Sequence, residues 1–348
     1  MLRSMDSAVA GLRAHQNKMD VIGHNLANVN TFGFKAQTYT FKEAMYQTSS
    51  ASTGGTTEAG GSNAAQYGYG TLMGTIGVDM TASTPSYVGG LNATINGEGF
   101  FLTSAKKYEG KAPAGGGTAL DTSKNIDLKD MGAEWEYTRV GQFSVDSNGY
   151  IVDGNGNFVY GFYPATSSTD AGYDADGLLN AAKLRPLRIP TDVEVKTDAG
   201  VTKTTLTFGE IGSTPSGGSG TVKPAKATSI SVNSLGEITA TVTPDGKDAV
   251  SGVHIGTLAI VTFQNPDGLT KAGETYYKAN DKDNTGRADA SVAGGEVATL
   301  MAGYIEASNV DLAKEFADMI MTQRGFQANS KMITVSDEML NELVNMKR

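Results

Sequence analysis

Apolar residues spaced alternately three and four positions apart occupy both ends of the chain, and this pattern limits the fold more than any other feature. Such spacing places side chains along one side of an α-helix, as in the seam of a coiled coil. Only Gln16 and Gly23 interrupt the N-terminal set. Its members are Leu2, Met5, Val9, Leu12, Met19 and Leu26. We expect a helix there that ends near Asn28, where residues that favour caps and turns begin.

The C-terminal set is longer and carries polar residues at three of its positions, Gln323, Ser330 and Asp337. Its apolar members are Leu312, Phe316, Met319, Phe326, Ile333, Leu340 and Val344. A helix of ~38 residues at 1.5 Å per residue is roughly 57 Å long. Such a helix is longer than a small domain is wide, so we expect it to need partner helices. The pattern leaves open whether these partners come from the same chain or from other copies.

The residues between about Gly90 and Phe263 show a different pattern, with short β-branched or aromatic runs separated by Gly, Asn and Asp. Asn148-Gly149, flanked by alternating residues, predicts a hairpin turn. Three stretches rich in small residues are expected to be loop-like, and they span residues 48–66, 111–124 and 212–226. The middle of the chain is therefore expected to be all-β.

These patterns predict an α+β fold, in which an all-β central domain is inserted between N- and C-terminal coiled-coil-like helices. The expected divisions are an inner helical domain of residues 1–30 and 305–348, a linker or adjuster segment of residues 31–75, and a β-rich domain of residues 76–304 with an insertion near 170–224.

The composition excludes several classes of partner. The chain of 348 residues has no cysteine and a formal net charge of -9, so disulfides are excluded and nucleic acid is not expected as a partner. No run of ~18 apolar residues occurs, and no apolar signal-peptide segment lies near the N-terminus. Membrane insertion is therefore not expected.

The sequence offers little for catalysis. His15 and His24 lie nine residues apart, on opposite faces of the predicted helix, so they cannot share a metal ion. No nucleophile, zinc or phosphate-binding motif is present. Asn25, Asn28 and Asn30 are expected to cap the helix and to form hydrogen bonds between helices. We expect no catalytic site, no metal site and no cofactor, so the protein is not expected to be an enzyme.

Three blocks of the sequence resemble a known family. Ala10-Gly11-Leu12, residues 19–31 and Gly33-Phe34-Lys35 resemble the N-terminal signature of bacterial flagellar rod and hook axial proteins. Residues 95–101 and 137–143 resemble the β domain of that family, and residues 308–330 resemble its C-terminal helix. The residues that carry the N-terminal motif are Asn25, Ala27, Asn28, Thr31, Gly33, Phe34 and Lys35. Residues from about Asp170 to Pro224 lie outside the resemblance.

The resemblance implies that the two end helices line the channel of a tubular homopolymer in the flagellum. It also implies several partners: adjoining rod and hook–filament junction proteins, the hook cap during assembly, and the flagellar type III export apparatus. Export without a cleaved signal peptide would account for the missing apolar segment.

Within the family, residues 161–166 and the chain length resemble hook proteins, so the hook is the expected location. The unmatched stretch is short for a hook protein, and residues 48–66 resemble an insertion of distal-rod proteins, so the distal rod is the alternative. A hypothesis from a different class is a secreted β-rich enzyme or glycan-binding protein.

Overall fold

The chain forms two compact units. The computed structural model describes residues 2–55, 60–107, 126–127, 134–163, 184–198, 201–207, 224–244, 248–279, 283–294 and 298–346. Unit 1 combines the two ends of the chain, Met1–Thr81 and Ser308–Arg348, and unit 2 is the continuous segment Ala82–Ala307. The chain therefore passes between the units twice, at Thr81–Ala82 and at Ala307–Ser308.

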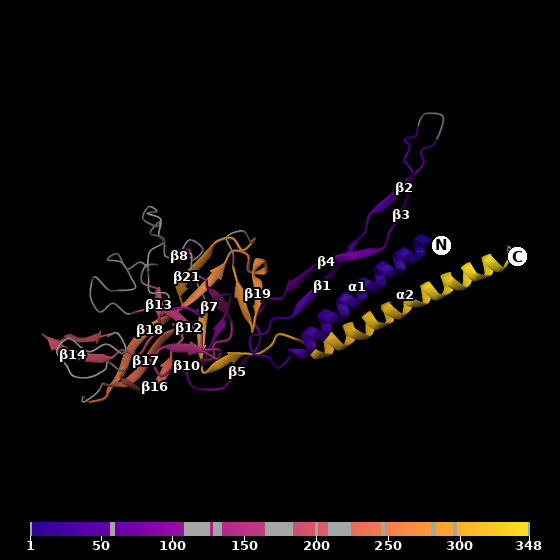
Figure 1. Ribbon diagram of the computed structural model, residues 1–348. Coiled ribbons are helices and arrows are strands. Elements are labelled where there is room, and N and C mark those ends of the chain that lie inside the picture. The colour runs from indigo at the N-terminus through magenta and orange to yellow at the C-terminus, as the bar shows by residue number, and fades with distance from the viewer. Residues whose placement is uncertain are drawn as a thin grey trace. The chain divides into compact units, whose positions relative to one another are not determined.

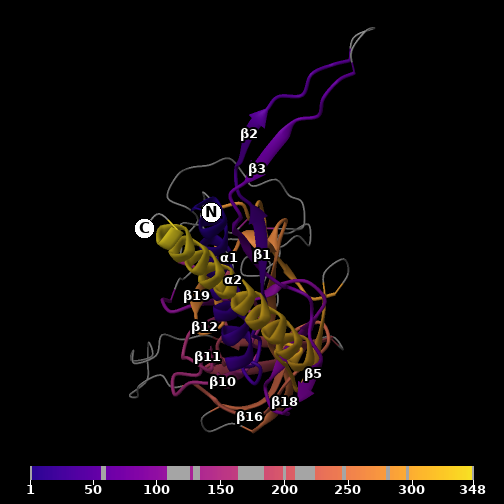
Figure 2. The ribbon, with the colours of Figure 1, turned by 90° about the vertical axis from the view of Figure 1, so that its right-hand side faces the viewer.

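Unit 1 contains two helices, α1 (Leu2–Ala27) and α2 (Leu312–Met346). They lie side by side and run antiparallel, so the N- and C-termini are at the same end of the pair (Figures 1 and 2). With strands throughout the rest of the described chain, these helices confirm the predicted α+β class. In the described part of the chain, no helix is both long enough and apolar enough to cross a lipid bilayer.

A two-stranded ribbon follows α1 in unit 1. Strands β1 (Gln37–Glu43) and β4 (Thr71–Val78) pair antiparallel, with an irregularity in register between Tyr39 and Phe41. Strands β2 (Tyr46–Ser50) and β3 (Ala65–Gly68) form a second antiparallel pair farther along the same excursion of the chain. The segment 31–75 was expected to be a linker, and its described residues form these strands. Thr and Tyr, which favour strands, are frequent there.

Unit 2 is built from short antiparallel strands. They are β5 (Pro85–Tyr87), β6 (Ala93–Asn96), β7 (Phe100–Ser104), β8 (Ile126–Asp127), β9 (Glu136–Thr138), β10 (Phe143–Val145), β11 (Ile151–Asp153), β12 (Phe158–Phe162), β13 (Leu184–Pro186), β14 (Asp192–Asp198), β15 (Val201–Thr207), β16 (Lys226–Val232), β17 (Glu237–Thr243), β18 (Val250–Phe263), β19 (Thr270–Gly273), β20 (Tyr276–Lys278), β21 (Ala288–Val292), β22 (Thr299–Ala302) and β23 (Tyr304–Glu306).

The long strand β18 organises this unit, since it pairs with β7, β12, β17 and β21. The hairpin predicted around Asn148-Gly149 is confirmed: β10 pairs with β11, and Gly149 adopts a φ of +79° in the turn. Of the insertion expected near 170–224, the structure describes β13, β14 and β15. The loop-like stretch 111–124 lies outside the described residues.

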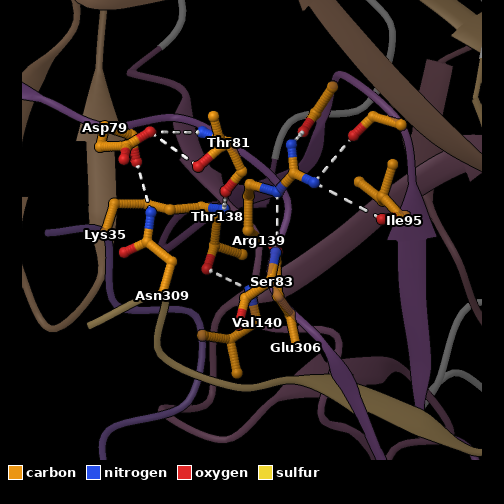
Figure 3. A network of polar contacts seen from close by, with 12 residues as sticks. Lys35, Asp79, Thr81, Ser83, Ile95, Thr138, Arg139, Val140, Glu306 and Asn309 are labelled. Atoms are coloured by element: carbon orange, nitrogen blue, oxygen red, sulfur yellow. Dashed lines mark hydrogen bonds and ion pairs between the residues drawn. The ribbon is translucent and has the colours of Figure 1, made fainter. Parts of the chain in front are cut away.

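A buried ion pair fixes the ends of unit 2. Arg139 Nε donates to Glu306 Oε2 at 2.8 Å, and both side chains are almost completely buried. The same guanidinium donates to the carbonyl oxygens of Gly99 and Gly97, and the Glu306 carboxylate accepts from Ser83 N (Figure 3). A buried pair with its hydrogen bonds satisfied is costly to break. The network therefore joins the first residues of unit 2 to its last.

The core of unit 2 yields a stability prediction. Phe101 is fully buried, and its ring packs edge-to-face on Phe143 with centroids 5.1 Å apart. Phe101→Ala should lower the free energy of unfolding by about 3 to 5 kcal/mol because it leaves a cavity. Urea unfolding followed by tyrosine and tryptophan fluorescence measures this.

The matched control is Tyr87→Ala, which removes an aromatic ring that is 72% exposed in the same unit. It should change the free energy of unfolding by less than about 1 kcal/mol. Equal losses in the two variants would contradict the assignment of this core.

Candidate functional site

The contact between α1 and α2 is made mainly by small and polar residues. Asn25 donates to Glu315 at 3.0 Å and Lys18 to Asp318 at 3.2 Å. Farther toward the N-terminus, His15 lies against Gly325 and Gly11 against Asn329: a Cβ on Gly325 would be 2.6 Å from the His15 ring, and one on Gly11 would be 2.7 Å from Asn329 Nδ2. A Cβ at either position would push the facing side chain aside.

The Asn25 side chain of α1 forms hydrogen bonds with both β1 and α2. Its side-chain oxygen accepts from Gln37 N at 2.9 Å, and its nitrogen donates to Gln37 O at 2.8 Å and to Glu315. The amide therefore pairs with the backbone at the start of β1 much as a neighbouring strand would. The predicted hydrogen bonding between the helices through Asn25 is confirmed.

Asn309, just before α2, makes similar contacts with the backbone before β1 and after β4. Its side-chain oxygen accepts from Ala36 N at 2.7 Å, and its nitrogen donates to Asp79 O at 2.9 Å (Figure 3). Lys35, which is almost completely buried, donates to Thr81 O at 2.6 Å. Two asparagines from opposite ends of the sequence thus hold both strands of the ribbon where it begins and ends.

The other residues of the N-terminal motif form the chain reversal after α1. Ala27 is the last residue of the helix, and Asn28 donates to His24 O at 2.9 Å and accepts from Thr31 Oγ1. Gly33 has a φ of +67°, a conformation that residues other than glycine rarely adopt. The buried Phe34 ring packs edge-to-face on His24. The predicted capping role of Asn28 is confirmed.

The ribbon covers a second side of α1. The Arg3 guanidinium lies 5.3 Å from the centroid of the Tyr67 ring. Gly70, at a φ of +97°, packs so closely on the helix that a Cβ there would be 3.1 Å from Ser7 and 3.3 Å from Ala10. The ribbon therefore reaches Ser7 and Ala10 of α1, and its strand β1 also contacts His15 and Asn25 in the row that faces α2.

The predicted apolar row of α1 lies on a third side. Val9 is 39% exposed, and Met5, Leu12, Met19 and Leu26 are partly exposed. The side chain of Leu2 is outside the described residues. This row is therefore partly covered and partly exposed in the described chain.

The predicted row of α2 is also left open. Leu312, Phe316, Phe326 and Val344 are exposed, by as much as 65% for Val344, and Met319, Ile333 and Leu340 are partly exposed. The buried positions of this helix are instead Glu315, Thr322 and Ser336. Each helix therefore contacts the other through residues one position before its apolar row.

This offset places the two apolar rows on the same side of the helix pair. One residue advances an α-helix by about 100°. When two antiparallel helices are viewed from one end, the chain of one turns clockwise and the chain of the other turns anticlockwise. The residues that come one position after the contact residues therefore lie on the same side of the pair in both helices. We call this combined surface, formed by the thirteen predicted seam residues, the leucine–phenylalanine face.

His15 has an unusual environment within the helix contact. Its Nδ1 is buried and has no hydrogen-bond partner among the described residues, and its ring packs edge-to-face on Phe41. Burial, and then the charge of Lys18, lower the pKa of His15 below its ordinary value of 6.5. In the described part of the chain, no group of three or more acidic or histidine side chains could hold a metal ion.

The residues of the helix contact were missed in the sequence because they are not apolar. Glu315, Thr322, Asn329 and Ser336 do recur every seven positions, which is a heptad signal carried by polar side chains. Such a signal is invisible to a search for apolar periodicity.

Three family models match the chain. One described as "Flagella basal body rod protein" matches residues 5–35, and one described as "Flagellar hook protein FlgE/F/G D1 domain" matches residues 127–240. One described as "Flagellar basal body rod FlgEFG protein C-terminal" matches residues 301–346. They cover α1, a large part of unit 2, and α2.

Individual relatives match along their whole lengths. The flagellar basal-body rod protein FlgG of Bacillus subtilis is 34% identical over 349 residues, covering 100% of both chains. The flagellar hook protein FlgE of Borreliella burgdorferi is 26% identical over 460 residues, again covering 100% of both chains. The hook protein FlgE of Salmonella typhimurium is 27% identical over 451 residues, covering 99% of this chain and 100% of that one.

The position of His15 predicts that acid destabilises the helix pair. Protonation would place a charge beside Lys18 of α1, Phe41 of β1 and Gly325 of α2, with Asp318 already paired to Lys18. Because the folded state lowers the pKa of His15, its contribution to stability is complete above pH 6.5 and is lost as the pH falls below that value. Far-ultraviolet circular dichroism of the full chain should show helix content falling as the pH is lowered from 8 toward 5.

His15→Gln, which cannot take up a proton, should flatten this pH dependence. The control is His24→Gln, at an exposed position of the same helix, which should keep it. Identical pH profiles for His15→Gln and the parent chain would rule out His15 as the cause.

Proposed function

The chain belongs to the family of bacterial flagellar rod and hook axial proteins, and from that premise we propose that it is a structural subunit that polymerises with copies of itself into a tube in the flagellar axis. Its role is mechanical: contacts between subunits transmit torque, and no catalytic step is involved. The observation that carries the proposal is the uncovered leucine–phenylalanine face. Burial of apolar surface is the main favourable term in protein association.

The distribution of charge supports burial of unit 1 among other copies. Unit 1 carries 10 basic and 11 acidic residues, whereas unit 2 carries 18 basic and 26 acidic residues. Most of the net charge of the chain therefore belongs to unit 2. A nearly neutral unit can pack against copies of itself without the repulsion that a high net charge creates.

We propose the distal rod as the location of the subunit. The rod relative is 34% identical over an alignment of 349 residues, whereas the hook relatives are 26% and 27% identical over alignments of 460 and 451 residues. The hook remains the second candidate, favoured by residues 161–166 and by full-length similarity to hook proteins.

The proposal includes the partners that the family resemblance implies. These are other copies of the chain, the adjoining rod and hook–filament junction proteins, the hook cap in the case of a hook subunit, and the flagellar type III export apparatus. The coiled-coil packing of the end helices in the tube belongs to the same proposal.

Deletion of the gene, followed by electron microscopy of isolated basal bodies, tests the location. A distal-rod subunit should leave basal bodies that lack both distal rod and hook, because the hook is built on the rod. A hook subunit should leave a complete rod without a hook. Intact rods and hooks in the deletion strain would exclude both, and would favour the class of secreted enzymes or glycan-binding proteins.

Disruption of the leucine–phenylalanine face should block polymerisation. Phe316 is 49% exposed, so Phe316→Asp should leave the chain folded, yet it would bury an unpaired charge if the face is covered by another copy. Sedimentation and negative-stain microscopy at rising concentration should show tubes for the parent chain and dispersed particles for the variant.

Lys331→Gln is the matched control, since it lowers the charge by the same one unit at an exposed position of the same helix, away from the face. This variant should polymerise as the parent does. Tubes of normal length from Phe316→Asp would show that the face is not an assembly surface.

A further inference from the structure

A second apolar surface runs along α2. Met321, Met332, Val335 and Met339 are exposed, by 61% in the case of Met321. They do not belong to the leucine–phenylalanine face. We call these four residues the methionine strip.

The strip lies across the helix contact from the leucine–phenylalanine face. Met321 and Val335 come one residue before the buried Thr322 and Ser336, whereas the members of the face come one residue after the contact positions. A step of about 100° per residue in each direction puts the two surfaces on opposite sides of α2. The rest of the helix carries exposed polar residues, including Arg324 and Lys331, together with the exposed apolar residues Ile320, Leu343 and Met346.

The symmetry of a tube determines how many surfaces a subunit needs. A closed two-fold dimer joins one patch to the same patch of its partner, but an open helical polymer joins two unlike patches head to tail. The helix pair presents two unlike apolar surfaces on opposite sides. An open polymer needs two different contact surfaces on each subunit, and the helix pair has two. A closed dimer would need only one.

We infer that the methionine strip is the second contact surface of the polymer, and that its occupant is the leucine–phenylalanine face of a second copy of the chain. This inference rests on the proposed function.

The chemistry of the two surfaces supports the pairing. Methionine side chains are flexible and make favourable contacts between sulfur and aromatic rings, and the opposing face offers the exposed rings of Phe316 and Phe326. The strip itself contains no charged residue. Unbranched methionines also adapt to small changes in the position of the facing side chains, so the contact tolerates variation between neighbouring subunits.

The absence of cysteine from the chain allows a direct test by disulfide cross-linking. One cysteine is placed in the strip by Met321→Cys. A second is placed in the face, at Phe316, Phe326 or Val344 in three separate variants, because the register between neighbouring copies is not known in advance. Cross-linking requires Cα atoms within about 7 Å, so it reports direct contact. Polymers formed under reducing conditions are oxidised and analysed by denaturing gel electrophoresis without reductant.

At least one double-cysteine chain should give a ladder of covalent oligomers, while each single-cysteine chain should stay monomeric on the gel. The matched control pairs Met321→Cys with Lys331→Cys on the polar side of the helix and should give no ladder. Dimers from Met321→Cys alone would mean that the strip contacts itself, and would overturn the inference.

The outcomes also separate this inference from the proposed function. Polymers that form normally but give no ladder with any of the three face positions would refute the pairing and leave the proposed function intact. A parent chain that forms no polymer at any concentration would refute the proposed function and the inference with it.

Discussion

The side chain of Asn25 is the point on which the architecture of unit 1 depends. It is 1% exposed, and its amide satisfies both backbone groups of Gln37 and one oxygen of Glu315. The end of α1, the start of β1 and the first turn of α2 are therefore joined through one residue. A buried amide without these partners would cost the desolvation of each polar group, so the three elements are ordered together. Asn309 repeats this arrangement with Ala36 and Asp79.

Because the helices meet through small and polar residues, their apolar side chains remain available. Gly11 and Gly325 allow close approach, and Lys18 with Asp318 adds a partly exposed ion pair worth at most about 1 kcal/mol. A helix pair joined by its apolar rows would have covered the surfaces that the proposed polymer uses. The polar contact positions and the exposed apolar side chains are thus two results of the same choice of residues.

Unit 2 is stabilised in a different way. Its strands surround a core of apolar side chains around β18, and the buried Arg139–Glu306 pair joins the residues by which the chain enters and leaves. Such a unit has its own source of stability and carries most of the net charge. The division of the chain into a self-contained β unit and a helical unit with exposed apolar faces is what the proposed role of an axial subunit requires.

The sequence alone determined the two end helices, the β-rich middle and the turn at Asn148-Gly149, because each follows from local periodicity or from the conformational freedom of glycine. It also identified the apolar rows, although their assembly role stays a prediction. Apolar periodicity did not identify Glu315, Thr322 and Asn329 as the positions where α2 meets α1, because their seven-residue recurrence is carried by polar side chains. Nor did it show that residues 37–78 pair as strands: their small and polar residues resemble a linker, and strand pairing depends on backbone partners that only the tertiary structure supplies. Local spacing thus determined which residues form the two apolar rows. Packing of α1 against α2 determined that both rows lie on the same side of the helix pair.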